Sequence, residues 1–433
     1  TSPILDSVNL TRRAEAQYIE PTPLGNPTSA LGTGGDTEYP GMPDNFYLQT
    51  RTDTRRNGDI IGPAIGVFGT PNPLFTSLAA RPELQGAYFY EIDIPAASVG
   101  QYRLELRVSC RNRSNSGTLA WDVYAPDATD ADFTDNISAG AIASGTRTRT
   151  DNTCTDADPA DGFDTSSTGR VDNGTDPHIQ FIDTAQWIQL QNLSVEGKYI
   201  LRVRSNPGQV LYSIRAARAG FVGPAQHCTS IPLPNEAGGT DAAIPSCPSI
   251  AAIDWLGSAA LEDTLENGVD PVEIFLTEVR PELAGNQLEV TLFDPADGIE
   301  CVRILDPFDN PIPFTWRTID NEVWGYSHAE YNTFTNGGGT GDLPDTASVP
   351  CGVSNLTALT DPRLPGNQTG GVGQIFQDRT VRFFLDVGTP ACNGANCWYK
   401  VQYEKGGSAA DRDLYDWNSW AVRVVGDPVR LIR

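Results

Sequence analysis

Histidine and lysine, two side chains that many enzymes use, each occur only three times in this chain. The histidines are His178, His227 and His328, and the lysines are Lys198, Lys400 and Lys405. None of the histidines has a partner at a spacing typical of a catalytic or zinc site. The hydrolase nucleophile elbow, the paired histidines of zinc proteases, the phosphate-binding loop and the dinucleotide glycine fingerprint are also absent from the sequence. We therefore predict that the protein is not an enzyme, although a glycosidase-type carboxylate pair stays open because acidic residues are abundant.

Positive charge is scarce as well. The 30 Lys and Arg residues face 55 Asp and Glu residues, which gives a formal net charge of -25. Nucleic-acid binding requires clustered cations that face phosphates, and the sequence has no such cluster. We therefore exclude nucleic acid as a partner. Because the basic residues are almost all arginine, whose planar guanidinium has several fixed donors, we expect arginine networks between strands.

No apolar run is long enough to span a bilayer, and the start at Thr1 does not have the pattern of a secretory leader. We expect no transmembrane segment in this chain. We also expect the chain to be a mature product or a fragment released from an upstream membrane anchor.

The residues that are plentiful predict an all-β fold. The chain has 42 glycines and 32 prolines, which favour turns and oppose long helices. Apolar residues alternate with polar ones from Tyr102 to Cys110 and again from Tyr199 to Arg204, which is typical of strands with one buried face. At 433 residues the chain is too long for one ordinary core. We predict two domains of the β-sandwich or jelly-roll type.

The composition divides the chain into four parts. We predict an extended N-terminal arm at 1–80, a first β-sandwich at 81–222, a disulfide-tied linker at 223–260 and a second β-sandwich at 261–433. A short helix is expected at 259–266. The start of the arm alternates like a strand, so it is a possible donor strand that pairs with a sheet edge of its own subunit or of another.

Eight cysteines form an even set, which predicts disulfides and an oxidising compartment. Pairing each cysteine with its nearest neighbour gives four bridges within the proposed parts, although eight cysteines allow many connectivities. These pairs are Cys110 with Cys154, Cys228 with Cys247, Cys301 with Cys351, and Cys392 with Cys397.

An acidic loop is a candidate calcium site, since Ca²⁺ prefers several oxygens from one flexible loop. Its ligands would be Asp156, Asp158, Asp161 and Asp164. The spacing departs from the EF-hand loop and lacks its final glutamate, so solvated acidic turns remain the alternative interpretation. No cofactor other than this calcium ion is expected.

Asn-x-Ser/Thr sequons indicate a surface glycoprotein, although such sequons also arise by chance in polar β proteins. The candidate asparagines are Asn9, Asn112, Asn136, Asn173, Asn192, Asn355 and Asn367. Aromatic residues near the C-terminus could bind surface glycans as an exposed platform, or could be core residues. These residues are Trp398, Tyr399, Tyr415, Trp417 and Trp420.

Three stretches resemble bacterial surface proteins of the TadE/TadG-like family, which is associated with tight-adherence pili. They are TRRAEAQYIEPTPLGNPTSALGTGG from Thr11, VEIFLTEVRPELAGNQLEVTLFDPADG from Val272, and CWYKVQYE from Cys397 with WAVRVVGDPVRLIR from Trp420. The resemblance implies a cell-surface or pilus-related β protein that normally follows a membrane-spanning helix. It brings no functional residues with it.

Together these features predict a structural subunit of an extracellular filament or pilus-like fibre. The subunits would associate with one another, and the N-terminal arm would add a strand to a neighbour. The alternative is a monomeric cell-surface adhesin that binds carbohydrate. Both place the protein outside the cell or on its surface.

Overall fold

The computed structural model describes the strands and the segments closest to them. The described residues are 15–18, 24–25, 28–32, 46–51, 64–65, 70–71, 85–108, 118–127, 133–148, 187–205, 209–218, 228, 233–234, 240–241, 246–261, 272–279, 283–294, 299–312, 314–319, 331–332, 379–387, 397–405, 415–425 and 429–432. In this part of the chain almost every regular element is a strand, so the predicted all-β class is confirmed. No helix among these residues is long and apolar enough to cross a bilayer.

The first large sheet has six strands. In spatial order these are β10 (Ala143–Thr148), β9 (Thr118–Tyr124), β12 (Gly197–Ser205), β7 (Tyr88–Ile94), β16 (Ser249–Ile253) and β2 (Leu24–Gly25). The short helix α2 (Phe133–Ser138) covers part of its outer face, where Phe133 packs on Phe89 with the ring centroids 5.2 Å apart. A 3-10 turn, η3 (Ala96–Ser98), follows β7.

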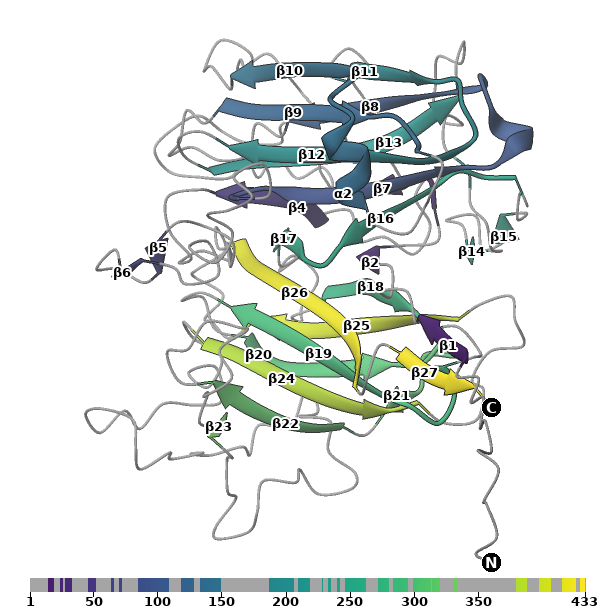
Figure 1. Cartoon of the computed structure of the whole chain (residues 1–433). Helices are drawn as coiled ribbons and strands as arrows, with labels where there is room; N and C mark the ends of the chain where they lie inside the picture. The colour runs from purple at the N-terminus through teal and green to yellow at the C-terminus, as the bar shows by residue number, and fades with distance from the viewer. Residues whose placement is uncertain are drawn as a thin grey trace, which may run out of the picture.

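The second large sheet has eleven strands and runs through both halves of the molecule (Figure 1). Its order is β11 (Ile188–Leu193), β8 (Tyr102–Val108), β13 (Gln209–Arg218), β4 (Phe46–Arg51), β17 (Leu256–Leu261), β26 (Tyr415–Val425), β19 (Gln287–Asp294), β24 (Arg379–Asp386), β22 (Phe314–Ile319) and β23 (Tyr331–Asn332), with β3 (Ala30–Leu31) also paired to β13.

A four-stranded sheet and three two-stranded ribbons complete the described fold. The four strands are β18 (Val272–Glu278), β25 (Trp398–Lys405), β20 (Ile299–Leu305) and β21 (Pro311–Ile312). The ribbons pair β1 (Glu15–Tyr18) with β27 (Val429–Ile432), β5 (Ala64–Ile65) with β6 (Thr70–Pro71), and β14 (Leu233–Pro234) with β15 (Thr240–Asp241).

The three larger sheets enclose one contiguous hydrophobic core. In the upper half of Figure 1 the six-stranded sheet packs on the β11 to β4 part of the long sheet. In the lower half the four-stranded sheet packs on the β26 to β22 part, and Ile274 and Val401 belong to the same core as Val290 and Phe383. The predicted core face of β8 is confirmed, because Tyr102, Leu104 and Leu106 are buried, but the opposite face is not exposed to solvent as expected, because Glu105 and Arg107 are buried as well.

Both large sheets contain strands from segments that we predicted to be an arm and a linker: β2 and β16 belong to the six-stranded sheet, and β3, β4 and β17 belong to the long sheet. Strands β2, β3 and β4 come from the predicted arm at 1–80, and β16 with most of β17 comes from the predicted linker at 223–260. The expected helix at 259–266 is wrong for 259–261, which belong to β17. These segments are strands because distant strands supply their hydrogen-bond partners, and a local sequence pattern does not reveal such partners.

The two halves join where β4 pairs with β17, with Leu48 opposite Ser258, and we call this junction the seam. Tyr88 reaches this junction from the six-stranded sheet, and its hydroxyl lies 3.1 Å from Ser419 Oγ on β26. Gly257 makes room for the tyrosine, since a Cβ there would lie 2.7 Å from the Tyr88 hydroxyl oxygen. One buried tyrosine therefore joins three strands at the seam.

The disulfide between Cys228 and Cys247 is confirmed, with the two Cα atoms 5.7 Å apart. Cys228 follows β13 of the long sheet and Cys247 precedes β16 of the six-stranded sheet, so the bridge holds the two layers together. The backbone around Cys228 is also fixed by Ser29, whose N–H donates to the Cys228 carbonyl at 2.9 Å. Inside the same sandwich, the hydroxyls of Tyr90 and Tyr212 hydrogen-bond across the core.

Replacing Gly257 with alanine should destabilise the seam, because the added methyl group overlaps Tyr88. We expect Gly257→Ala to lower the free energy of unfolding by about 1–3 kcal/mol, measured by urea denaturation. The double variant with Tyr88→Phe should lose less than the sum of the two single changes, because phenylalanine lacks the hydroxyl oxygen that the added methyl group would overlap most closely. A Gly257→Ala protein as stable as wild type would contradict this account of the seam.

Candidate functional site

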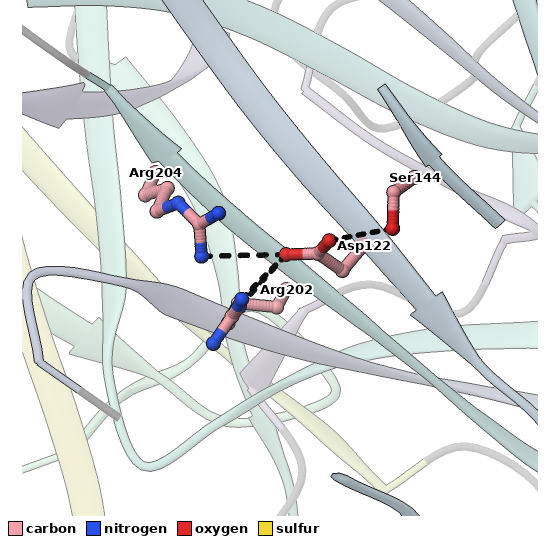
Figure 2. Close-up of polar contacts among 4 residues, drawn as sticks. All are labelled: Asp122, Ser144, Arg202 and Arg204. Carbon is pink, nitrogen blue, oxygen red and sulfur yellow. Dashed lines mark hydrogen bonds and ion pairs between the residues drawn. The ribbon is translucent and has the colours of Figure 1, made fainter. Parts of the chain in front are cut away.

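Three strands bring four polar side chains together on the outer face of the six-stranded sheet (Figure 2). Asp122 on β9 lies directly opposite Ser144 on β10 and Arg202 on β12. The Ser144 hydroxyl donates to Asp122 Oδ1 at 2.7 Å, while Arg202 Nε and Nη2 donate to Oδ2 at 3.0 and 2.6 Å. Arg204 Nη1 lies 3.3 Å from the same Oδ2. The carboxylate therefore links three neighbouring strands.

The surroundings of Asp122 favour its ionised form. Burial raises the pKa of this carboxyl, but the hydrogen bonds from Ser144 and Arg202 and the charges of Arg202 and Arg204 outweigh burial and lower the pKa below its ordinary value of 3.8. Asp122 is thus an anion held by two cations. Arg202 also lies near the Tyr124 ring, with its Cζ 6.0 Å from the ring centroid.

A second carboxylate cluster lies on the outer face of the long sheet. Glu105 on β8 is opposite Arg215 on β13, whose Nε donates to Glu105 Oε2 at 2.8 Å. Arg103 Nε pairs with the other carboxylate oxygen. The Arg215 guanidinium also stacks on Trp187, with Cζ 3.9 Å from the ring centroid, and Arg107 approaches the same ring at 4.9 Å. Both members of the central pair are buried.

A third cluster repeats this arrangement in the other half of the same sheet. Glu289 on β19 is opposite Arg423 on β26, whose Nη2 donates to Oε2 at 2.8 Å. Arg382 on β24 places Nε 3.1 Å from Oε1, and the Thr291 hydroxyl lies 3.4 Å from that oxygen. The expected arginine networks between strands are confirmed in all three clusters. Their common feature in the sequence is a charged residue at the outward position of a strongly alternating strand.

The ion pairs and hydrogen bonds of these clusters join neighbouring strands. Because its pKa is lowered, Asp122 is a poor proton donor at neutral pH. In the described part of the chain, no three His, Cys, Asp or Glu side chains approach closely enough to hold one metal ion. The predicted calcium ligands Asp156, Asp158, Asp161 and Asp164 lie outside the described residues, as do the histidines.

The remaining predicted cysteine pairs are only partly described. Cys397 is disulfide-bonded, and its predicted partner Cys392 lies outside the described residues. Cys301 is on β20. Cys110, Cys154 and Cys351 lie outside the described set. Free cysteines are absent from the described part of the chain.

Two of the predicted glycosylation sites can be placed in the structure. Asn136 on α2 is buried, and its Nδ2 donates to the carbonyls of Ala125 at 2.8 Å and Lys198 at 3.3 Å. A glycan on Nδ2 would have to break these contacts, so the folded chain does not present Asn136 as an acceptor. Asn192 is exposed on β11. The sequons at Asn9, Asn112, Asn173, Asn355 and Asn367 lie outside the described residues.

The C-terminal aromatic residues do not form the expected exposed platform where their side chains are described. Trp398, Tyr399 and Trp420 are all buried. Trp398 packs edge to face on Phe275, with the ring centroids 6.0 Å apart. Tyr399 and Trp420 belong to the contiguous core, whereas Trp398, on the opposite face of β25 from Tyr399, is buried as a cross-strand pair with Phe275. Tyr415 and Trp417 are in β26, and their side chains are outside the described set.

The structural features suited to a partner are strand edges and the ribbon of β1 and β27. The ribbon pairs Glu15 with Ile432 through Tyr18 with Val429, and it shares no strand with the three larger sheets. The alternation of apolar and polar residues at the start of the arm predicts the strand β1 but not its partner. It gave no signal for β27 as that partner, because the two strands lie at opposite ends of the chain.

A scan against protein-family models and a search of curated proteins each find no match for this chain.

Neutralising Asp122 should destabilise the first sandwich in a pH-dependent way. Because the folded pKa is lowered, the ionised group stabilises the fold above the unfolded pKa near 3.8, and that contribution is lost as the pH falls through the folded pKa. We expect Asp122→Asn to cost about 1–3 kcal/mol of unfolding free energy at neutral pH and progressively less in acid. Urea denaturation across the pH range measures this difference.

The matched control is Arg204→Gln, which removes the more exposed arginine of the same cluster. Its cost should be about 0–1 kcal/mol, as for other solvent-accessible ion pairs. A loss for Asp122→Asn that does not change with pH would contradict the assignment of an ionised, arginine-bound carboxylate.

Proposed function

We propose that the protein is a structural subunit of an extracellular bacterial surface filament in which subunits join through β-strand contacts. The observation that carries this proposal is the ribbon formed by β1 and β27. Four consecutive residue pairs hold β1 in this ribbon, and the ribbon is separate from the sheets that enclose the core. Isolated two-stranded ribbons are at best marginally stable in water, so β1 is a strand that the chain can release while its core stays folded.

The rest of the described chain suits a rigid structural subunit. The long sheet joins both halves, and the Cys228–Cys247 bridge ties its first part to the six-stranded sheet. The arginine clusters join neighbouring strands on the outer faces. Disulfides are typical of proteins that work outside the cytoplasm, which supports an extracellular location. The resemblance to TadE/TadG-like proteins at Thr11, Val272 and Cys397 supports the same proposal, and includes the segment that forms β1.

In this proposal β1 leaves β27 of its own chain and pairs with a strand of the next subunit. Exchange of an identical element between copies requires no new type of contact. When one surface of a subunit binds a different surface of the next copy, the copies form either a closed ring or an open fibre. The rotation between successive copies decides which of the two forms.

Removing β1 tests the proposal. A variant that lacks residues 1–20 should keep the far-ultraviolet circular dichroism and thermal midpoint of the wild-type core, because β1 belongs to none of the larger sheets. It should form no filaments in negative-stain electron microscopy of material from the producing cells. Filaments identical to those of wild type would contradict the proposal.

A point substitution provides the matched control for this deletion. Ala16→Pro removes one backbone donor from β1 and should also abolish filaments. Ala16→Val keeps that donor and favours the strand conformation, so it should assemble as the wild type does.

A further inference from the structure

The outer edges of the three larger sheets differ in how well they can accept another strand. Three of the edge strands, β2, β21 and β23, have only two residues each. Two others, β11 and β18, contain register shifts, between Gln189 and Gln191 and between Phe275 and Thr277. Short strands and irregularities of this kind are ways in which proteins protect an edge from pairing.

The sixth edge strand, β10, has neither form of protection. It pairs with β9 over six consecutive residues, from Ala143 opposite Val123 to Thr148 opposite Thr118, without a shift in register. Its sequence, ASGTRT, contains no proline and no lysine, and Arg147 is its one charged residue. Ser144, Thr146 and Arg147 are exposed, and Ala143 and Gly145 are half-buried. In the described part of the chain β10 pairs with β9 alone.

The β10 edge is also held in place before any partner arrives. The Ser144 hydroxyl bonds to Asp122, which is itself fixed by Arg202 (Figure 2). On the opposite face, the indole of Trp121 occupies the space next to Gly145 where a side chain would otherwise lie. An edge that is already ordered loses less conformational entropy when another strand pairs with it.

The positions of β10 and the ribbon of β1 and β27 match a head-to-tail contact. Figure 1 shows β10 at one end of the molecule and this ribbon towards the other end. A strand released from one end of a subunit and an edge at the other end that no described strand covers give a heterologous contact that can repeat without closing.

We propose that β1 of one copy of this chain adds to the β10 edge of the next copy and extends its six-stranded sheet. This inference rests on the proposed filament function and names the acceptor strand. Backbone hydrogen bonds to the open edge of β10 would hold the donor, as in other cases of β-strand addition. The Asp122 cluster then acts as the anchor that keeps the acceptor strand in register.

A lysine placed on the acceptor edge tests this assignment. Thr146→Lys puts a charged side chain on the exposed side of β10 and should abolish filaments, while the monomer keeps the wild-type circular dichroism and thermal midpoint. The matched control is Gln189→Lys, which makes the same kind of change at an exposed position of the irregular edge strand β11. This control should form filaments as the wild type does.

A cysteine crosslink between copies identifies the acceptor directly. One chain carries Ala16→Cys and a second carries Thr146→Cys, and the two are assembled together under mild oxidation. We expect a disulfide-linked heterodimer on a non-reducing gel. The control mixes Ala16→Cys with Leu431→Cys, since Ala16 and Leu431 are opposite one another within one chain. It should give much less heterodimer, because β1 would pair with β10 and not with β27 of the next copy.

The outcomes separate the acceptor assignment from the proposed function. Filaments of normal length from Thr146→Lys would overturn β10 as the acceptor, and so would a heterodimer that forms only with Leu431→Cys. In either case the filament function would still be supported if removal of β1 abolishes filaments. If wild-type protein forms no filaments, the proposed function fails and this inference fails with it.

Discussion

The pairing of β4 with β17 is the constraint on which the rest of the structure depends. It places Leu48 opposite Ser258 and thereby converts two sandwich layers into one sheet of eleven strands. Without this pairing, the first sandwich would end at β4 and the second would begin at β17. With it, both share one core, and the distance between the two ends of the molecule is fixed by backbone hydrogen bonds.

The packing at the seam explains the choice of Tyr88 and Gly257. Tyr88 is buried between three strands, and Gly257 is needed beside it because any larger residue would overlap the ring. On the outer faces, arginine side chains join neighbouring strands, as apolar side chains do in the core. Glu105 and Glu289 are buried, and each is bound by arginines from its own or neighbouring strands, since an unpaired buried carboxylate would be costly. Arginine suits this role better than lysine because its charge is permanent and its donors are fixed in one plane.

The sequence predicted the local features of this fold well. Alternation from Tyr102 identified the buried face of β8, the cysteine spacing identified the bridge at Cys228, and the scarcity of lysine indicated arginine networks. It did not predict which strands pair, because alternation defines the face of a strand and not its neighbour. β4 and β17 are separated by about two hundred residues in the sequence, so their segments were assigned to an arm and a linker. For the same reason Asn136 matched a sequon while its amide is buried against β12, and Trp398 matched a surface aromatic while it is buried against Phe275.

The central claim is that the two halves form one structural unit through β4 and β17. Hydrogen exchange measured by mass spectrometry across a denaturant series tests it most directly, with peptides that cover β9 and β12 in one half and β19 and β24 in the other. If the claim is right, both sets of amides lose protection at the same denaturant concentration, because the shared sheet couples their unfolding. Loss of protection in one half while the other stays fully protected would contradict it.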